Sequence, residues 1–185
     1  AVRVVGCPEG FDWPVFLEPV DPALRQSPDA VASWFGANTP ALMAEVSRIG
    51  AIVLRGFAVR ETADFARLVA DIPLPDGGYA GGATPRSGLA EKVFESTKYP
   101  AQYKLPLHQE MAYLPSYPSK LIFFSRVAAE TGGETTIRDM RRFAARVPAT
   151  FAAELREKGV RYVRNYRDPA WSTGKAGSFE VGLCE

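Results

Sequence analysis

Proline and glycine interrupt this chain at short intervals, which limits the length of any helix or strand. The 185 residues include 15 prolines and 16 glycines. Proline lacks a backbone N–H and glycine weakens the interior of a regular element, so clusters of the two mark turns. We therefore expect short elements joined by many turns. A chain of 185 residues is long enough for one domain with a sizeable core, and we expect a single domain.

Charge and cysteine content exclude several classes of protein. The net charge of +1 leaves no surplus for broad attraction to nucleic acid or to anionic lipid, so neither is an expected partner. No apolar run approaches the roughly 20 residues that span a bilayer. Cys7 and Cys184 lie near opposite ends without the spacing of a zinc ribbon or a disulfide framework. A reducing cytoplasmic location is the expectation.

The first half of the chain predicts a strand between two helices after an irregular start. Six prolines in residues 1–40 predict an irregular N-terminal wrap. Thr39 and Pro40 predict the start of a helix that ends at Gly50. The regions expected next are a buried strand over 51–57, a helix over 61–72 and a Gly/Pro-rich loop over 73–90, so that 41–90 forms a helix-strand-helix unit and its loop.

The second half predicts closely spaced short strands, which are typical of a sandwich or barrel. The strands are expected at 93–94, 103–107, 121–127, 135–137 and 160–166. A helix is expected over 139–158, either continuous or broken in two at Pro148. Residues 91–168 then form the first part of the barrel core, and 169–185 stay unassigned.

His108 is the single histidine, and it stands in the run Leu107-His108-Gln109-Glu110. Residues two apart in an extended chain point to one face, so the imidazole and the Glu110 carboxylate can meet one ion. They would supply two ligands of the 2-His-1-carboxylate triad that binds non-haem Fe(II). Taken alone, this spacing is more often a surface or hydrogen-bonded pair, so the sequence context has to decide.

Several segments around this pair resemble the taurine dioxygenase-like family of Fe(II)/2-oxoglutarate oxygenases. They are the early strand Gly50–Phe57, the Gly-rich stretch Tyr79–Arg86, the run Pro118–Arg126 and the segment Thr131–Asp139. The similarity extends from about residue 40 to Asn165. It is strongest to clavaminate synthase-like and syringomycin-biosynthesis-like members, which use Glu as the carboxylate ligand. The resemblance implies a mainly β jelly roll, a double-stranded β-helix with flanking helices.

The resemblance also implies roles for single residues. His108 and Glu110 are the expected iron ligands, and Thr135 is expected to donate a hydrogen bond to 2-oxoglutarate, after a turn at Gly132-Gly133. Strand alternation places Lys104 on the face of His108, where it contacts co-substrate or substrate, or is simply solvated. Arg86 is a candidate to bind a substrate carboxylate, and an exposed loop arginine is the alternative.

The implied reaction hydroxylates or desaturates a small amino acid, free or tethered to a carrier protein. It consumes O₂ and decarboxylates 2-oxoglutarate to succinate. The family supplies its second histidine ligand, and an arginine for 2-oxoglutarate, from strands beyond the point where this sequence stops, so the jelly roll is expected to be incomplete at the C-terminus. A truncated or frame-disrupted product, a sequence joined across missing segments and a genuinely shortened relative all fit.

Two alternatives to the oxygenase stay open. A shortened relative would be a non-catalytic binding or interaction module whose open sheet edge meets a partner, and a homo-oligomer is one way to cover that edge. A hydrolase that uses Cys7 or Cys184 lacks a nearby base, because the chain has no histidine beside either thiol.

Overall fold

The computed structural model describes residues 1–7, 10–73, 88–90, 92–96, 105–115 and 117–163. The chain divides into two units, Ala1–Met140 and Arg141–Glu185. The two β-sheets found among the described residues lie in the first unit. Helices account for more of the described residues than strands do, so within this part the chain is less β-rich than the sequence predicts.

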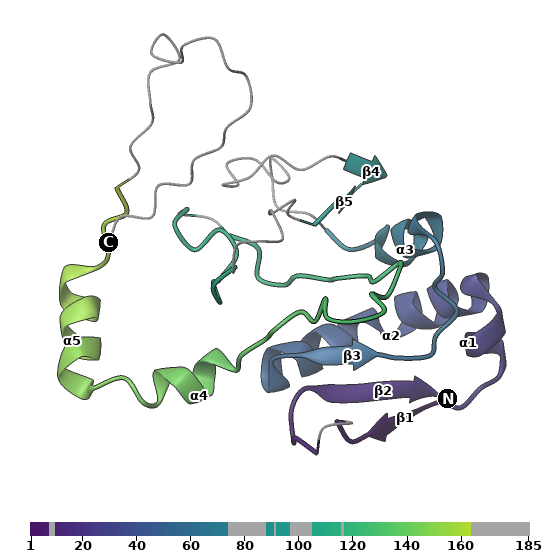
Figure 1. Cartoon of the computed structure of the whole chain (residues 1–185), viewed down its shortest axis with the longest axis horizontal. Coiled ribbons are helices and arrows are strands. Elements are labelled where there is room, and N and C mark those ends of the chain that lie inside the picture. Colours follow the sequence, from purple (N-terminus) through teal and green to yellow (C-terminus); the bar gives the residue numbers. More distant parts are fainter. Residues whose placement is uncertain (8–9, 74–87, 91, 97–104, 116, 164–185) are drawn as a thin grey trace, which may run out of the picture. The chain divides into compact units, whose positions relative to one another are not determined.

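The N-terminal sheet combines an antiparallel pair with a parallel pair (Figure 1). Its strands are β1 (Val2–Val5), β2 (Val15–Pro19) and β3 (Ile52–Leu54), in the order β1-β2-β3. Val4 stands opposite Leu17 in the antiparallel pair, and Phe16 opposite Val53 in the parallel pair. Parallel strands need a long crossover, and here two helices provide it: α1 (Ala23–Gln26) and α2 (Pro28–Ile49).

The predicted irregular wrap over residues 1–40 is therefore wrong, and so is the helix start at Pro40. Helix α2 begins at Pro28, where the missing N–H costs nothing because the first helical N–H groups have no partner within the helix. Ser27 caps this end by accepting a hydrogen bond from the Ala30 N–H at 3.2 Å. Proline at a helix start and at a strand end, as at Pro19, is compatible with regular structure.

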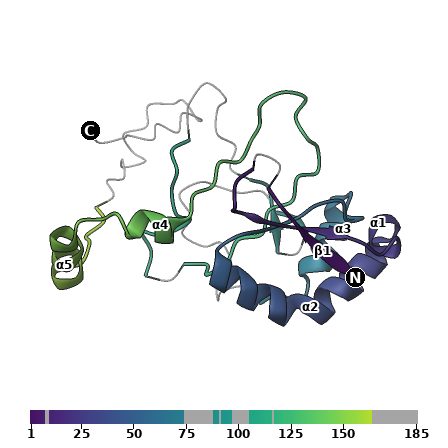
Figure 2. The same ribbon diagram turned by 90° about the horizontal axis from the view of Figure 1, so that it is seen from below.

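Pro40 lies inside α2, which continues through it (Figure 2). Proline cannot donate to the carbonyl of Gly36, so the helix loses one of its internal hydrogen bonds there. Just before this point, Asn38 and Thr39 donate side-chain hydrogen bonds to the carbonyls of Trp34 and Phe35, at 2.7 and 2.8 Å. The helix ends at Gly50, as predicted, with φ of 99° and a hydrogen bond from its N–H to the Val46 carbonyl.

The core of the first unit lies between α2, the sheet and α3 (Thr62–Val69). The predicted strand over 51–57 and helix over 61–72 are confirmed with shorter bounds. The rings of Trp34 and Phe57 stack with centroids 5.1 Å apart. The buried core residues are Leu24, Val31, Phe35, Ala58, Leu68, Val69 and Val93.

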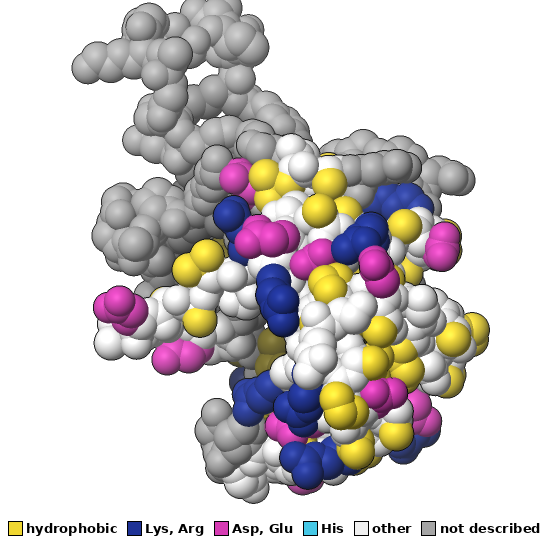
Figure 3. Space-filling model, turned by 90° about the vertical axis from the view of Figure 1, so that its right-hand side faces the viewer, with side chains coloured by type: hydrophobic (Ala, Val, Ile, Leu, Met, Phe, Trp, Pro, Cys, Tyr) yellow, Lys and Arg dark blue, Asp and Glu magenta, His cyan; other side chains and the backbone are white. Residues whose placement is uncertain are grey.

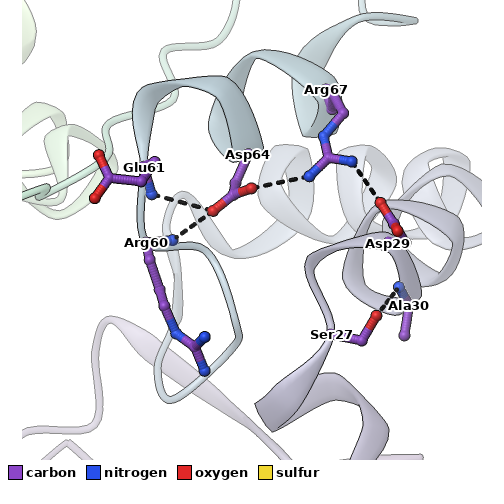
Figure 4. A network of polar contacts seen from close by, with 7 residues as sticks. All are labelled: Ser27, Asp29, Ala30, Arg60, Glu61, Asp64 and Arg67. Atoms are coloured by element: carbon purple, nitrogen blue, oxygen red, sulfur yellow. Dashed lines mark hydrogen bonds and ion pairs between the residues drawn. The ribbon is translucent and has the colours of Figure 1, made fainter.

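Polar contacts at the start of α3 connect it to the first turn of α2 (Figure 4). Asp64 accepts hydrogen bonds from the backbone N–H groups of Arg60 and Glu61, both at 3.1 Å. Arg67 donates to Asp64 at 2.9 Å and forms an ion pair with Asp29. The N–H of Arg60 is the main cause that holds the pKa of Asp64 below its usual value, followed by the N–H of Glu61.

A two-stranded sheet follows, made of β4 (Gly88–Ala90) and β5 (Val93–Phe94). The strand over 93–94 is confirmed, whereas residues 88–90 belong to β4 rather than to the predicted loop, whose residues 74–87 lie outside the described part. Lys92 reaches the C-terminal end of α3, where its Nζ donates to the carbonyls of Ala70 and Ile72 at 2.6 and 3.2 Å. This contact fixes the second sheet against α3.

The remaining predicted strands are not formed within the described residues. Residues 105–107, 121–127, 135–137 and 160–163 have no regular secondary structure apart from a bend at 126–127, and they pair with no described strand. Residues 103–104 and 164–166 lie outside the described part. A strand forms only when its backbone hydrogen-bonds to a second strand, and an apolar run in the sequence does not show which segment that second strand is. Phe123 and Val127 are accordingly 67% and 80% exposed. The two sheets are small, and no closed barrel forms in this part of the chain.

Two helices separate at Pro148, as the second of the sequence alternatives predicts: α4 (Met140–Ala144) and α5 (Ala149–Lys158). Pro148 starts α5 and Gly159 ends it, with φ of 70°. Neither helix buries a side chain among the described residues. None of the helices in the described part combines the length and apolarity needed to cross a membrane. On the face shown in Figure 3, basic and acidic side chains are interspersed, in keeping with the near balance of charge.

Candidate metal centre

His108 lies in residues 105–109, which have no regular secondary structure, and Glu110 begins the turn over residues 110–113. The Nε2 atom of His108 is 3.9 Å from Oε2 of Glu110. The imidazole is about half exposed, at 53%, whereas the Glu110 side chain retains only 14% of its exposure. The structure thus brings the two predicted ligands together, with one accessible and the other largely covered.

The imidazole is held from its other side by the backbone. Nδ1 of His108 is 2.8 Å from the carbonyl oxygen of Pro106, two residues earlier. Because the partner is a main-chain atom of the same segment, the contact needs no distant part of the fold. It sets the direction of the ring relative to the chain that carries Glu110.

Met111, directly after the pair, has a conformation that the sequence does not reveal. Its φ of 56° lies in the left-handed region, which is rare for a long side chain, and the side chain is only 7% exposed. The Leu114 N–H donates to the Met111 carbonyl at 2.9 Å and closes the turn. Strained backbone of this kind persists where surrounding contacts hold it, and here it redirects the chain next to Glu110.

The other predicted site residues are not joined to this pair. Thr135 is exposed on an unpaired stretch, and within the described residues no hydrogen bond connects it to His108 or Glu110. Lys104 and Arg86 lie outside the described residues. Gly132 and Gly133 have φ values of 69° and 77°, which favour glycine, although the structure assigns no turn to these two residues. A Cβ on Gly133 would stand 2.9 Å from the Cβ of Ala129, so this position also needs glycine for space.

The apolar run after the pair, residues 121–127, is attached to α3 at two points. The ring of Phe124 stacks on that of Phe65, with centroids 5.2 Å apart. Nε of Arg126 lies 3.3 Å from Oε2 of Glu61, the residue that precedes α3. These contacts place an unpaired segment beside the helix without burying its other apolar side chains.

The donor types fit iron, although the ligand set is incomplete. An imidazole nitrogen and a carboxylate oxygen are donors that non-haem Fe(II) uses. Two neighbouring ligands, each about 2.1 Å from one ion, stand about 3 Å apart, and Nε2 of His108 and Oε2 of Glu110 are 3.9 Å apart in this structure. Among the described residues no group of three or more potential ligands occurs. His108 is the only histidine in the sequence, so a second imidazole is missing from these 185 residues.

Comparison with known proteins gives a family match over most of the chain. The model of the family described as "Taurine catabolism dioxygenase TauD, TfdA family" matches residues 18–181. The dapdiamide synthesis protein DdaC of Enterobacter agglomerans is 36% identical over 121 residues, which are 65% of this chain and 37% of that protein. A clavaminate synthase-like protein of Arabidopsis thaliana is 36% identical over 118 residues, 62% of this chain and 36% of its own length.

This chain therefore spans a little over a third of the length of these curated relatives. The search of solved structures found no match.

Proposed function

This chain belongs to the TauD/TfdA family of taurine catabolism dioxygenases, and on that premise we propose that it carries the first two metal ligands of an Fe(II)- and 2-oxoglutarate-dependent oxygenase centre. His108 and Glu110 are the proposed ligands. The observation that carries the proposal is the 3.9 Å approach of their side chains on one short segment. Two electron-rich groups that face each other across this distance suit a bound cation.

Bound iron, together with 2-oxoglutarate and O₂, would supply oxidation of an unactivated C–H bond and release succinate. The chain's own side chains would position the reactants. Thr135 would donate its hydroxyl hydrogen to a carboxylate of 2-oxoglutarate, and Lys104 would add a positive charge beside it. Arg86 would bind a carboxylate of the substrate through two parallel hydrogen bonds.

Family membership implies a jelly-roll fold, and we assign residues 91–168 to its first part. Segments 105–107, 121–127 and 135–137 would then become strands once they are paired. The exposure of their apolar side chains supports this assignment, because such side chains are usually buried in a sheet. Leu107 is 56% exposed and Ile137 is 49% exposed. Burial in a closed sheet would remove that apolar surface from water.

The substrate class proposed is a small amino acid or a carrier-tethered derivative, which is hydroxylated or desaturated in the cytoplasm. The name of the bacterial relative, a dapdiamide synthesis protein, supports a biosynthetic role. The balanced charge supports a small molecule rather than nucleic acid as the main ligand.

The proposal is tested by adding Fe(II) and 2-oxoglutarate to the protein without oxygen. An oxygenase centre gives a weak visible charge-transfer band, which His108→Ala and Glu110→Gln should abolish. Gln109→Ala, between the two ligands and exposed, is the matched control and should retain the band. Because two protein ligands hold a metal less tightly than three, we expect saturation only at high Fe(II) concentration.

A non-catalytic binding module is the second candidate, favoured by the lack of a three-ligand group among the described residues. It predicts no band at any Fe(II) concentration and no succinate in the presence of O₂. That result would show that His108 and Glu110 form a structural pair.

A further inference from the structure

The contact between His108 and Pro106 determines where the imidazole carries its hydrogen. A main-chain carbonyl oxygen only accepts hydrogen bonds. At 2.8 Å, the Nδ1 atom of His108 must therefore be the donor to the Pro106 carbonyl. The contact is local, so it can form in the absence of any metal.

A neutral imidazole has a single N–H, so a hydrogen on Nδ1 leaves a lone pair on Nε2. Nε2 is the atom that lies 3.9 Å from the Glu110 carboxylate, which itself is an acceptor when ionised. Neither group supplies a hydrogen to the other in this form. Two acceptors thus stand 3.9 Å apart, and a cation is a partner that suits both.

We propose that Pro106 is a positioning residue, whose carbonyl selects the Nδ1–H form of His108 and so presents Nε2 and Glu110 as a metal-binding pair before the ion arrives. The inference rests on the proposed function, in which His108 and Glu110 are metal ligands. Metal-binding histidines commonly donate their second N–H to a carbonyl or carboxylate, which fixes the ring and raises ligand basicity. Proline suits this position because its ring fixes φ and reduces the freedom of the carbonyl it carries.

The tautomer can be read directly from the metal-free protein by NMR. With one histidine in the chain, long-range ¹H–¹⁵N correlations of a ¹⁵N-labelled sample give a single imidazole pattern. In mildly alkaline buffer we expect the pattern of a protonated Nδ1 and a bare Nε2. The denatured protein supplies the reference, because no fixed carbonyl selects a tautomer there. A folded protein with the hydrogen on Nε2, or with the same tautomer mixture as the denatured sample, would overturn the proposal.

Substitution at Pro106 tests the positioning role. Pro106→Gly frees the backbone, so we expect a mixture of tautomers and about tenfold weaker Co(II) binding, at the lower end of the range for groups that orient metal ligands. Pro106→Ala keeps more of the backbone restriction, so its tautomer ratio and its Co(II) affinity should lie between those of Pro106→Gly and those of the parent protein. Pro118→Gly, the same change twelve residues later, is the control and should alter neither readout.

The two readouts separate this inference from the function it rests on. A protonated Nδ1 in a protein that binds no Co(II) would support the role of Pro106 while refuting the oxygenase centre. Co(II) binding with Nε2 protonated in the metal-free state would do the reverse. Unchanged tautomer and affinity in folded Pro106→Gly would refute the role of Pro106.

Discussion

Asp64 shows how a single carboxylate can determine the start of a helix. It accepts hydrogen bonds from two backbone N–H groups just before α3, those of Arg60 and Glu61, and from the guanidinium of Arg67. The first N–H groups of a helix have no partner within the helix, so a side-chain acceptor stabilises that end. Since Arg67 also pairs with Asp29, the same residue connects α3 to α2.

Replacing Asp64 should lower stability and change its dependence on pH. The pKa of Asp64 is lower in the folded protein than its usual value, so its contribution is present at neutral pH and is lost as the pH falls below about 4. We expect Asp64→Asn to lower the free energy of unfolding at pH 7 by about 1 kcal/mol. The difference between variant and parent should shrink toward pH 3. Urea unfolding at a series of pH values measures both effects.

Asp71→Asn is the control, because Asp71 is exposed and lies beyond the end of α3. A difference between Asp64→Asn and the parent that stays constant from pH 7 to pH 3 would contradict the role assigned to the Asp64 charge.

Part of the candidate site could be predicted from the sequence at the scale of single residues. The spacing of two residues predicted that His108 and Glu110 approach each other, which is a local property, but Glu110 lies in a turn rather than in the expected strand. The left-handed backbone of Met111 and the hydrogen bond to the Pro106 carbonyl have no sequence signal. Both depend on the conformation that the surrounding chain imposes on one or two torsions.

At the scale of elements, α2 shows why proline position matters more than proline number. Pro28 stands at the first position of the helix, where it fits, and Pro40 stands in the interior, where it removes a hydrogen bond. The rule that places proline at a helix start predicted a start at Pro40, which is wrong, whereas Pro28, where the helix does start, was assigned to an irregular wrap. Burial of Val31 and Phe35, upstream of Pro40, decides the outcome because it requires a helix there.

Pro40→Ala should therefore stabilise the protein. The new N–H can bond to the Gly36 carbonyl, and we expect a gain of about 1 to 3 kcal/mol in the free energy of unfolding. Pro28→Ala is the matched control and should change stability by less than about 0.5 kcal/mol, because an N–H at that position has no helical partner. Thermal and urea unfolding give both values. Equal effects of the two substitutions would show that α2 is not continuous through Pro40.

At the scale of the whole molecule, burial is unevenly distributed between the two units. Val31, Phe35 and Leu68 belong to the core of the first unit, whereas α5 buries no side chain among the described residues. A ten-residue helix without packing is marginal in water. Local stability therefore should differ widely along the chain.

Hydrogen exchange measured by mass spectrometry should reveal this difference. We expect backbone amides in α5 to exchange at least about tenfold faster, relative to the denatured chain, than those of the first three turns of α2. Similar protection in the two helices would mean that α5 is packed against a partner surface, and would contradict the description of its side chains as exposed.

Local chemistry in the sequence determined the features whose signals are contained within a few residues: the end of α2 at Gly50, the break at Pro148, the positive φ of Gly132 and Gly133 and the nearness of His108 to Glu110. Tertiary structure decided the rest. Whether 121–127 becomes a strand depends on a partner strand distant in the sequence, because the hydrogen bonds of a ladder join two strands. Likewise, only packing against the core shows that the helix around Pro40 begins at Pro28.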